Sequence, residues 1–178
     1  MPPREVDVII SFVTVAAVAV AATLMTITRA NAVHALLYFI VSLFATALMF
    51  FLLGAPFAAA LEVIVYAGAI MVLFIFVVML LNLGPESVAG ERRLLSPRAW
   101  IGPTVLVLVL CAELIVTLAA GILPAPGAAG AVGPQAVGTT LFGPYVLGVE
   151  LASMLLLAGL VGAYHLGRRR NDAGGPQR

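Results

Sequence analysis

The sequence has few charged residues and a single cysteine. Charged residues make up 10% of its 178 positions, whereas a soluble domain carries about 25%. The chain is therefore not predicted to be a soluble globular protein. Cys111 has no second cysteine with which to form an intramolecular disulfide, and one cysteine cannot supply a cysteine-rich zinc or iron–sulfur site. These absences exclude a redox centre built from this chain alone.

Basic patches and catalytic motifs are absent as well. The formal net charge is +1, and no patch of Lys or Arg follows a helix or a groove, which removes the electrostatic basis for nucleic-acid binding. The sequence contains no phosphate-binding loop, dinucleotide fingerprint, Ser/His/Asp set or metal-ligand spacing. We therefore predict no catalytic, cofactor-binding or metal-ligating residue on this chain.

Long hydrophobic runs dominate what remains. Hydrophobic residues make up 63% of the chain, and the mean hydropathy is +1.17. A bilayer core of about 30 Å needs roughly 20 apolar residues in helical form, because hydrocarbon offers backbone groups no other partner. The chain is predicted to be an all-α membrane protein, a bundle of five transmembrane helices in a single multi-pass domain over residues 1–178. The predicted spans are 6–28, 32–53, 57–83, 101–123 and 145–166.

The arginines predict how these spans are oriented. With five spans, eight of the nine arginines fall on one side of the membrane, and Arg4 alone falls on the other. Cytoplasmic loops carry the excess of positive charge in membrane proteins. We therefore expect the N-terminus outside and the C-terminus in the cytoplasm. Five spans without an internal repeat cannot form two inverted halves, which weakens the hypothesis of a stand-alone transporter.

Three acidic residues fall inside the predicted spans. An ionisable group in hydrocarbon costs at least about 2.5 kcal/mol, so each needs a partner or a purpose. Glu62, Glu113 and Glu150 have no basic residue within any span with which to pair. Each carboxyl is either protonated and hydrogen-bonded to a neighbouring helix, or a stop on a proton path. In the second case its partners come from another chain.

The third span contains an unusual group of small residues. Gly68 lies near the middle of the span, between Ala67 and Ala69, while Glu62 and Tyr66 are four residues apart and therefore share a helix face. Small residues allow close packing of two helices. They also lower the crowding that opposes a π-bulge. Both interpretations are compatible with the sequence.

A π-bulge at this place has a geometric consequence. Because an α-helix has 3.6 residues per turn, gaining or losing one residue rotates everything beyond the bulge by about 100°. Met71, Val72 and Phe74 follow Gly68 directly and would move as a block. We therefore predict a π-bulge near the middle of the third helix.

Three stretches carry a resemblance to a known family. EVIVYAGAIMVLF, which starts at Glu62, closely resembles the third helix of the subunit J family of proton-pumping NADH:quinone oxidoreductase, respiratory complex I. NAVHALLY, at residues 31–38, resembles the start of the second helix of that family, and residues 138–163 resemble the fifth. The sequence departs from the family pattern before Glu150, where Gly148 and Val149 stand in place of Pro-Phe.

The resemblance implies a non-redox subunit of a translocase in a bacterial plasma membrane. It implies contact with the lipid bilayer and with the quinone-site subunit, the first proton-path subunit and the antiporter-like subunits. NADH, FMN, iron–sulfur clusters and quinone would belong to other subunits, with no cofactor on this chain. It also implies that the third helix switches between α and π winding around Tyr66 to Gly68, opening or closing a water path. The residues expected to serve coupling or the proton path are Glu62, Tyr66, Gly68, Met71, Val72, Phe74, Glu113 and Glu150.

Other functions remain open at this point. The chain is also compatible with the homologous subunit of a related quinone or hydrogenase-type complex that uses another electron donor. A second alternative is a scaffold bundle that only holds partner subunits. A stand-alone small transporter is the third.

Overall fold

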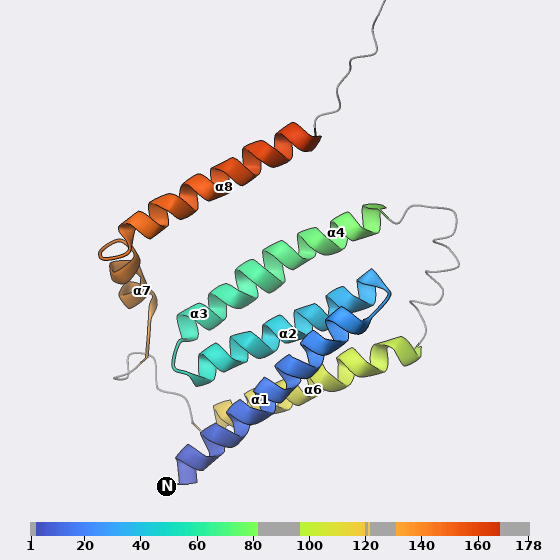
Figure 1. Ribbon diagram of the computed structural model, residues 1–178. Helices are drawn as coiled ribbons and strands as arrows, with labels where there is room; N and C mark the ends of the chain where they lie inside the picture. The colour runs from blue at the N-terminus through green and yellow to red at the C-terminus, as the bar shows by residue number, and fades with distance from the viewer. Residues whose placement is uncertain (1–2, 82–96, 120, 122–130, 168–178) are drawn as a thin grey trace, which may run out of the picture. The chain divides into compact units, whose positions relative to one another are not determined.

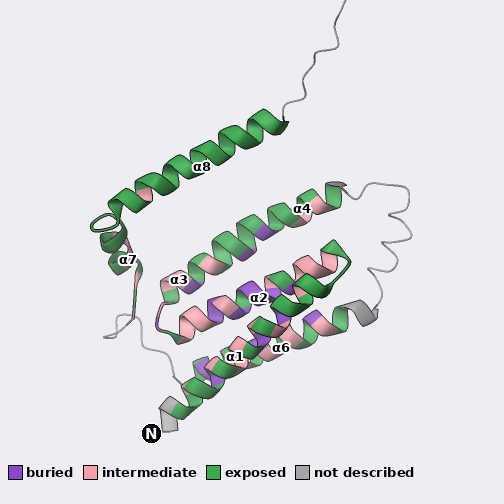
Figure 2. Ribbon diagram, in the orientation of Figure 1, coloured by how far each residue is buried: buried purple, intermediate pink, exposed green. Residues whose placement is uncertain are grey.

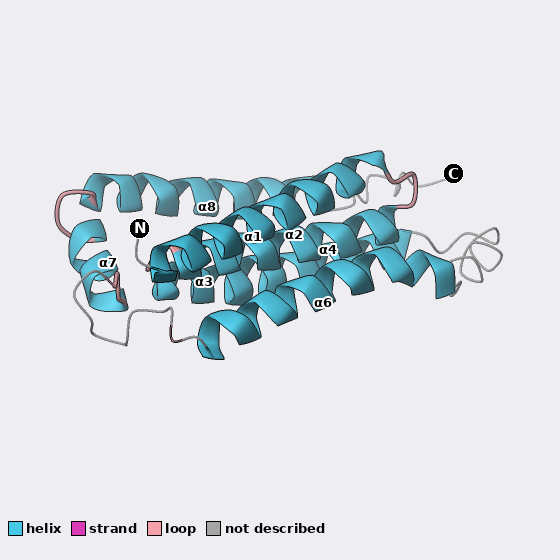
Figure 3. Ribbon diagram, turned by 90° about the horizontal axis from the view of Figure 1, so that it is seen from below, coloured by secondary structure: helices cyan, strands magenta, loops and turns pink. Residues whose placement is uncertain are grey.

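The structure is all-helical in the residues that it describes. The computed structural model describes residues 3–81, 97–119, 121 and 131–167, and within them Figure 3 shows helices joined by loops and turns. In chain order (Figure 1) the helices are α1 (Pro3–Thr28), α2 (Ala32–Leu52), α3 (Pro56–Leu61), η1 (Glu62–Ile70), α4 (Met71–Leu81), α6 (Pro97–Ala119), α7 (Pro134–Leu141) and α8 (Val146–Gly167). Since α3, η1 and α4 follow without a break, they form one joined helix.

Five helices of the described part are long and apolar enough to cross a membrane. The all-α fold class with five spans is thereby confirmed. The ends predicted at residues 83 and 123 lie outside the described residues, and the other predicted ends agree with the helices to within a few residues. The candidate spans are Val6–Thr28, Ala32–Leu52, Pro56–Leu80, Trp100–Ala119 and Val146–Gly167.

Local sequence explains where the second and third spans begin. The Asn31 side chain caps α2 by accepting hydrogen bonds from the backbone N–H groups of Val33 and His34, at 3.0 and 3.2 Å. After α2, Gly54 adopts a φ of 79°, a left-handed conformation that favours glycine. Pro56 then stands in the first turn of α3, where its missing N–H costs no helical hydrogen bond. These two short turns place consecutive helices antiparallel and adjacent.

The chain divides into two compact units, Met1–Gly133 and Pro134–Arg178. In the first unit, α2 packs against α1, α6 and the joined helix. A hydroxyl–hydroxyl hydrogen bond of 2.8 Å links Thr23 on α1 to Ser42 on α2, a type of contact that helps to hold helices together where lipid supplies no hydrophobic drive. The buried side chains that join α1, α2 and α6 are Val15, Val18, Ala22, Val41, Ala45, Leu48 and Leu110.

The second unit consists of α7 and α8. Within it, every residue of α8 except Val149 is exposed (Figure 2), although the helix is apolar enough to span a membrane. An apolar helix needs lipid or another helix around it. The surroundings of α8 are therefore not supplied by its own unit.

Candidate functional site

The third span contains a π-helical segment. The backbone N–H of Glu62, at its start, donates to the carbonyl oxygens of Ala58 and Ala59, as in a tightly wound α-helix. At its end the N–H of Met71 donates to the carbonyl oxygen of Tyr66, five residues back. Such i to i−5 bonding defines π winding. The π-bulge predicted in the third helix is therefore present, and it includes Tyr66 and Gly68.

Gly68 fits this winding because it has no side chain. A Cβ atom added at Gly68 would lie 3.2 Å from the backbone carbonyl oxygen of Val63, five residues earlier. That distance is shorter than an ordinary van der Waals contact between carbon and oxygen, so the carbonyl would have to yield by a few tenths of an ångström. Glycine removes this crowding inside the π segment. Gly68 therefore favours the π winding that this segment has.

The burial pattern of the joined helix fits a π segment that contains one residue more than an α-helix of the same number of turns. Ala59 is buried on α3, and the next buried positions are Ala67 and Met71. Eight residues of continuous α-helix would turn position 67 about 80° away from position 59. With one residue absorbed by the π segment, Ala67 takes the place that Tyr66 would otherwise occupy, only about 20° from Ala59. By the same count, Met71 stands where Ile70 would.

Met71 is the most deeply buried side chain of this helix, with 1% of its surface exposed. It packs with Ala67 against Leu43 of α2, next to the partly buried Leu36 and Ile40. We call these three α2 residues, Leu36, Ile40 and Leu43, the α2 seat. The current winding therefore selects which side chain of the third helix occupies the α2 seat.

The other residues predicted to move with Met71 have different surroundings. Val72 and Phe74 expose 59% and 54% of their surfaces, and Tyr66 exposes 51%. Return to continuous α winding would bring Ile70, which exposes 38% of its surface, into the place of Met71.

The three predicted acids lie on three different helices. Glu62 is half-buried, and among the hydrogen bonds of the described residues none joins it to Tyr66. Glu113 on α6 is also half-buried, and its backbone carbonyl accepts a hydrogen bond of 2.7 Å from the Thr117 hydroxyl. Glu150 lies on α8 in the second unit, where its backbone carbonyl accepts a hydrogen bond of 2.7 Å from Ser153. Their carboxyl groups therefore belong to three different helices.

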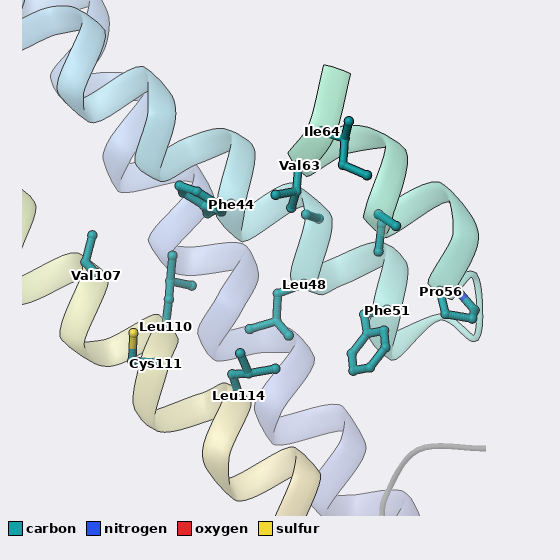
Figure 4. Close-up of a pocket in the computed structure, with 13 residues that line it drawn as sticks. Phe44, Leu48, Phe51, Pro56, Val63, Ile64, Val107, Leu110, Cys111 and Leu114 are labelled. Carbon is teal, nitrogen blue, oxygen red and sulfur yellow. The ribbon is translucent and has the colours of Figure 1, made fainter. Parts of the chain in front are cut away.

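An apolar groove of about 620 Å³ lies between α2, the third span and α6 (Figure 4). Neither Glu62 nor Glu113 is among the residues that line it, although their neighbours Val63 and Leu114 are. The groove offers no acid, base or charged group for chemistry. Other side chains on its wall include Phe44 and Phe51 from α2, Ile64 from η1 and Cys111 from α6.

No group of three or more His, Cys, Asp or Glu side chains that could hold a metal ion occurs in the described ranges. Within those ranges one polar side-chain atom, Nε2 of His34, is buried without a hydrogen-bond partner. His34 lies in the first turn of α2, one turn before Tyr38. This position is at an end of α2, away from the π segment.

Sequence reasoning gave no role to Tyr38 and Gly102. Tyr38 on α2 is buried, with 4% of its surface exposed, and its phenol occupies the space where a side chain at position 102 of α6 would lie. The guanidinium of Arg29 lies 5.3 Å from the centre of the Tyr38 ring. The available signal was a glycine inside an apolar helix, because glycine lowers helix stability unless packing requires it.

Comparison with known proteins places these features in one family. The family model for NADH-ubiquinone/plastoquinone oxidoreductase chain 6 matches residues 22–166. A protein of Pseudomonas aeruginosa named NADH-quinone oxidoreductase subunit J is 61% identical over 163 residues, which cover 89% of this chain and 96% of the relative. The protein of the same name from Escherichia coli is 56% identical over 155 residues, covering 85% and 82%. That of Rhodobacter capsulatus is 35% identical over 169 residues, covering 92% and 84%.

Proposed function

Because the chain belongs to the NADH-ubiquinone/plastoquinone oxidoreductase chain 6 family, we propose that it acts as a coupling subunit in the membrane part of a bacterial NADH-quinone oxidoreductase, respiratory complex I. Its third helix changes winding and thereby links quinone reduction to proton translocation. Family membership and relatives named as subunit J support the complex. They favour NADH over another electron donor.

The observation that carries the coupling role is the π segment with Met71 on the α2 seat. Return to continuous α winding would put Tyr66 and Ile70 in place of Ala67 and Met71. Met71 and Ile70 are similar in volume, and swaps of this kind usually cost less than about 1.5 kcal/mol. Tyr66 is larger than Ala67, so in α winding the neighbours of that position must move, at a cost of about 1–3 kcal/mol when a core is overpacked. A two-state element needs two packings of similar free energy, and the neighbouring subunits offset this difference. Small changes in neighbouring subunits then suffice to shift the helix between them.

The change in winding controls a water path. Beyond Gly68 the helix rotates by about 100°, so Val72 and Phe74 move into or out of the path. Glu62, Glu113 and Glu150 provide protonatable groups on three helices. Because no Lys or Arg lies within a span of this chain, the groups that complete the path come from other subunits.

The chain contributes no catalytic centre of its own. NADH, FMN, iron–sulfur clusters and quinone are handled by other subunits, and the spans of this chain form one multi-pass membrane domain. Its partners are the quinone-site subunit, the first proton-path subunit and the antiporter-like subunits. The N-terminus lies outside the cell and the C-terminus in the cytoplasm, as the arginine distribution favours.

The test is Gly68→Val in the assembled complex. Its Cβ would crowd the Val63 carbonyl oxygen and raise the barrier to rewinding. We expect a lower number of protons pumped per NADH oxidised, measured in proteoliposomes, while subunit content is retained. Ala69→Val, which adds bulk one position along the same helix, is the matched control. Full coupled turnover in Gly68→Val would favour the scaffold function instead.

A further inference from the structure

Tyr38 and Gly102 form a tertiary contact that depends on the absence of a side chain. A Cβ atom added at Gly102 would overlap the Tyr38 hydroxyl oxygen and would lie 3.1 Å from Cζ and 3.5 Å from Cε1 of the ring. The phenol therefore fills a notch in the surface of α6, which we call the Gly102 notch. Because Tyr38 is almost completely buried, its ring has little free space into which it could retreat.

Arg29 covers the same ring from the turn between α1 and α2. Its guanidinium carbon lies 5.3 Å from the ring centre, within the range of a cation–π contact. Its Nη2 atom also lies 3.4 Å from the Met25 sulfur on α1. Tyr38 thus connects α2 to α6 through the notch and to the end of α1 through Arg29. A residue held from two elements resists rotation of its own helix.

The opposite side of α2 carries the α2 seat. Leu36 and Ile40 are each two residues from Tyr38, and two residues correspond to about 200° of helix rotation. They therefore face away from the Gly102 notch, toward the third span, where they pack with Met71. Any rotation of α2 that frees Tyr38 from the notch also turns the seat away from Met71.

We propose that Tyr38 is a positioning residue for the third helix. Its phenol, held in the Gly102 notch, sets the rotation of α2 about its axis and therefore the position of the α2 seat, which receives Met71. This inference rests on the proposed function, because the seat matters for coupling only if the third helix changes its winding. The proposed function describes only the helix that moves. This inference identifies the fixed element, α2 held against α6, relative to which the third helix rewinds.

The experiment is a size exchange in the assembled complex. Gly102→Ala fills the notch, and Tyr38→Phe removes the hydroxyl that the new methyl group would overlap. The double variant therefore combines the added methyl group with the loss of the oxygen that it would meet. A Leu43→Cys/Met71→Cys pair is introduced in a Cys111→Ser background. The yield of the disulfide between these two cysteines reports how close the α2 seat lies to the third helix. Proton pumping per NADH oxidised is measured in parallel, without the cysteine pair.

We expect Gly102→Ala to lower the disulfide yield by about twofold or more, the lower end of what residues in direct contact show, and to lower the proton-to-NADH ratio. The double variant is expected to restore both in part, because the overlap with the hydroxyl is gone while the added Cβ would still lie 3.1 Å from Cζ of the ring. Ile101→Val trims an exposed side chain one residue before the notch and is expected to change neither.

Three outcomes would overturn the proposal. The first is Gly102→Ala with unchanged disulfide yield, and the second is a double variant whose disulfide yield is no higher than that of Gly102→Ala alone. The third is a disulfide yield that falls and recovers while the proton-to-NADH ratio stays constant, since Tyr38 would then only support packing. If the third helix does not change its winding, the Gly68→Val variant will show full coupling. That outcome leaves the disulfide result for Tyr38 and Gly102 unaffected.

Discussion

The backbone N–H of Met71 donates to the carbonyl oxygen of Tyr66, five residues earlier, where an α-helix would join residues four apart. This single bond at the end of η1 marks where the third span has absorbed an extra residue. Its effect continues beyond the bond, because Met71 and not Ile70 reaches the α2 seat. The winding of the backbone therefore determines which side chain of the third helix packs on the α2 seat.

Met71→Ala should destabilise the contact between the third span and α2. Truncating a fully buried methionine leaves a cavity and costs about 2–5 kcal/mol in soluble proteins. We expect a lower thermal midpoint for dissociation of the subunit from the membrane part. Met71→Leu keeps the volume and is expected to cost less than about 1.5 kcal/mol. Equal midpoints for the two variants would show that burial of Met71 contributes little.

Glu62→Gln should weaken proton pumping more than assembly. The substitution keeps the shape and hydrogen-bonding capacity of the side chain but removes its ability to release a proton. We expect the proton-to-NADH ratio to fall in proteoliposomes while the content of all membrane subunits stays near the wild-type level. Val63→Ala, at the next position, is the control for local packing. Loss of the subunit from the complex in Glu62→Gln would instead assign the carboxyl a structural role.

The orientation can be tested with single cysteines in a Cys111→Ser background. Glu5→Cys, just before the first span, is expected to react with a membrane-impermeant thiol reagent in intact cells, because the arginine distribution places the N-terminus outside. Asp172→Cys is expected to react only after the membrane is opened. The reverse pattern of labelling would invert the topology. Labelling of both sites in intact cells would contradict an odd number of spans.

Much of the fold could be predicted from hydropathy. Runs such as 32–53 are long enough to cross a bilayer, and hydrocarbon leaves a chain of this kind no alternative to helices. The short turns before the second and third spans follow from the same runs, because three residues separate each of these predicted spans from the one before it. The π segment was also foreseeable, because Gly68 between two alanines is a local property of the chain.

The candidate site was predictable only in part. Met71, Val72 and Phe74 were expected to move as a block, but nothing in their order indicated that Met71 alone is buried. Tyr38 and Gly102 received no role, since a contact between residues on two helices leaves no local pattern. Whether Glu113 and Glu150 serve the proton path stays a prediction.

The sequence by itself determined that there are five helical spans and that the third can accommodate π winding, because the bilayer and the glycine act on the chain locally. The tertiary structure decided which face of each helix meets its neighbour: Met71 on the α2 seat and Tyr38 in the Gly102 notch. The physical reason is that these helices are apolar on nearly all sides, and lipid is as apolar as leucine. The spacing of apolar residues along these helices therefore does not specify a buried face. The buried face depends on the fit of individual side chains.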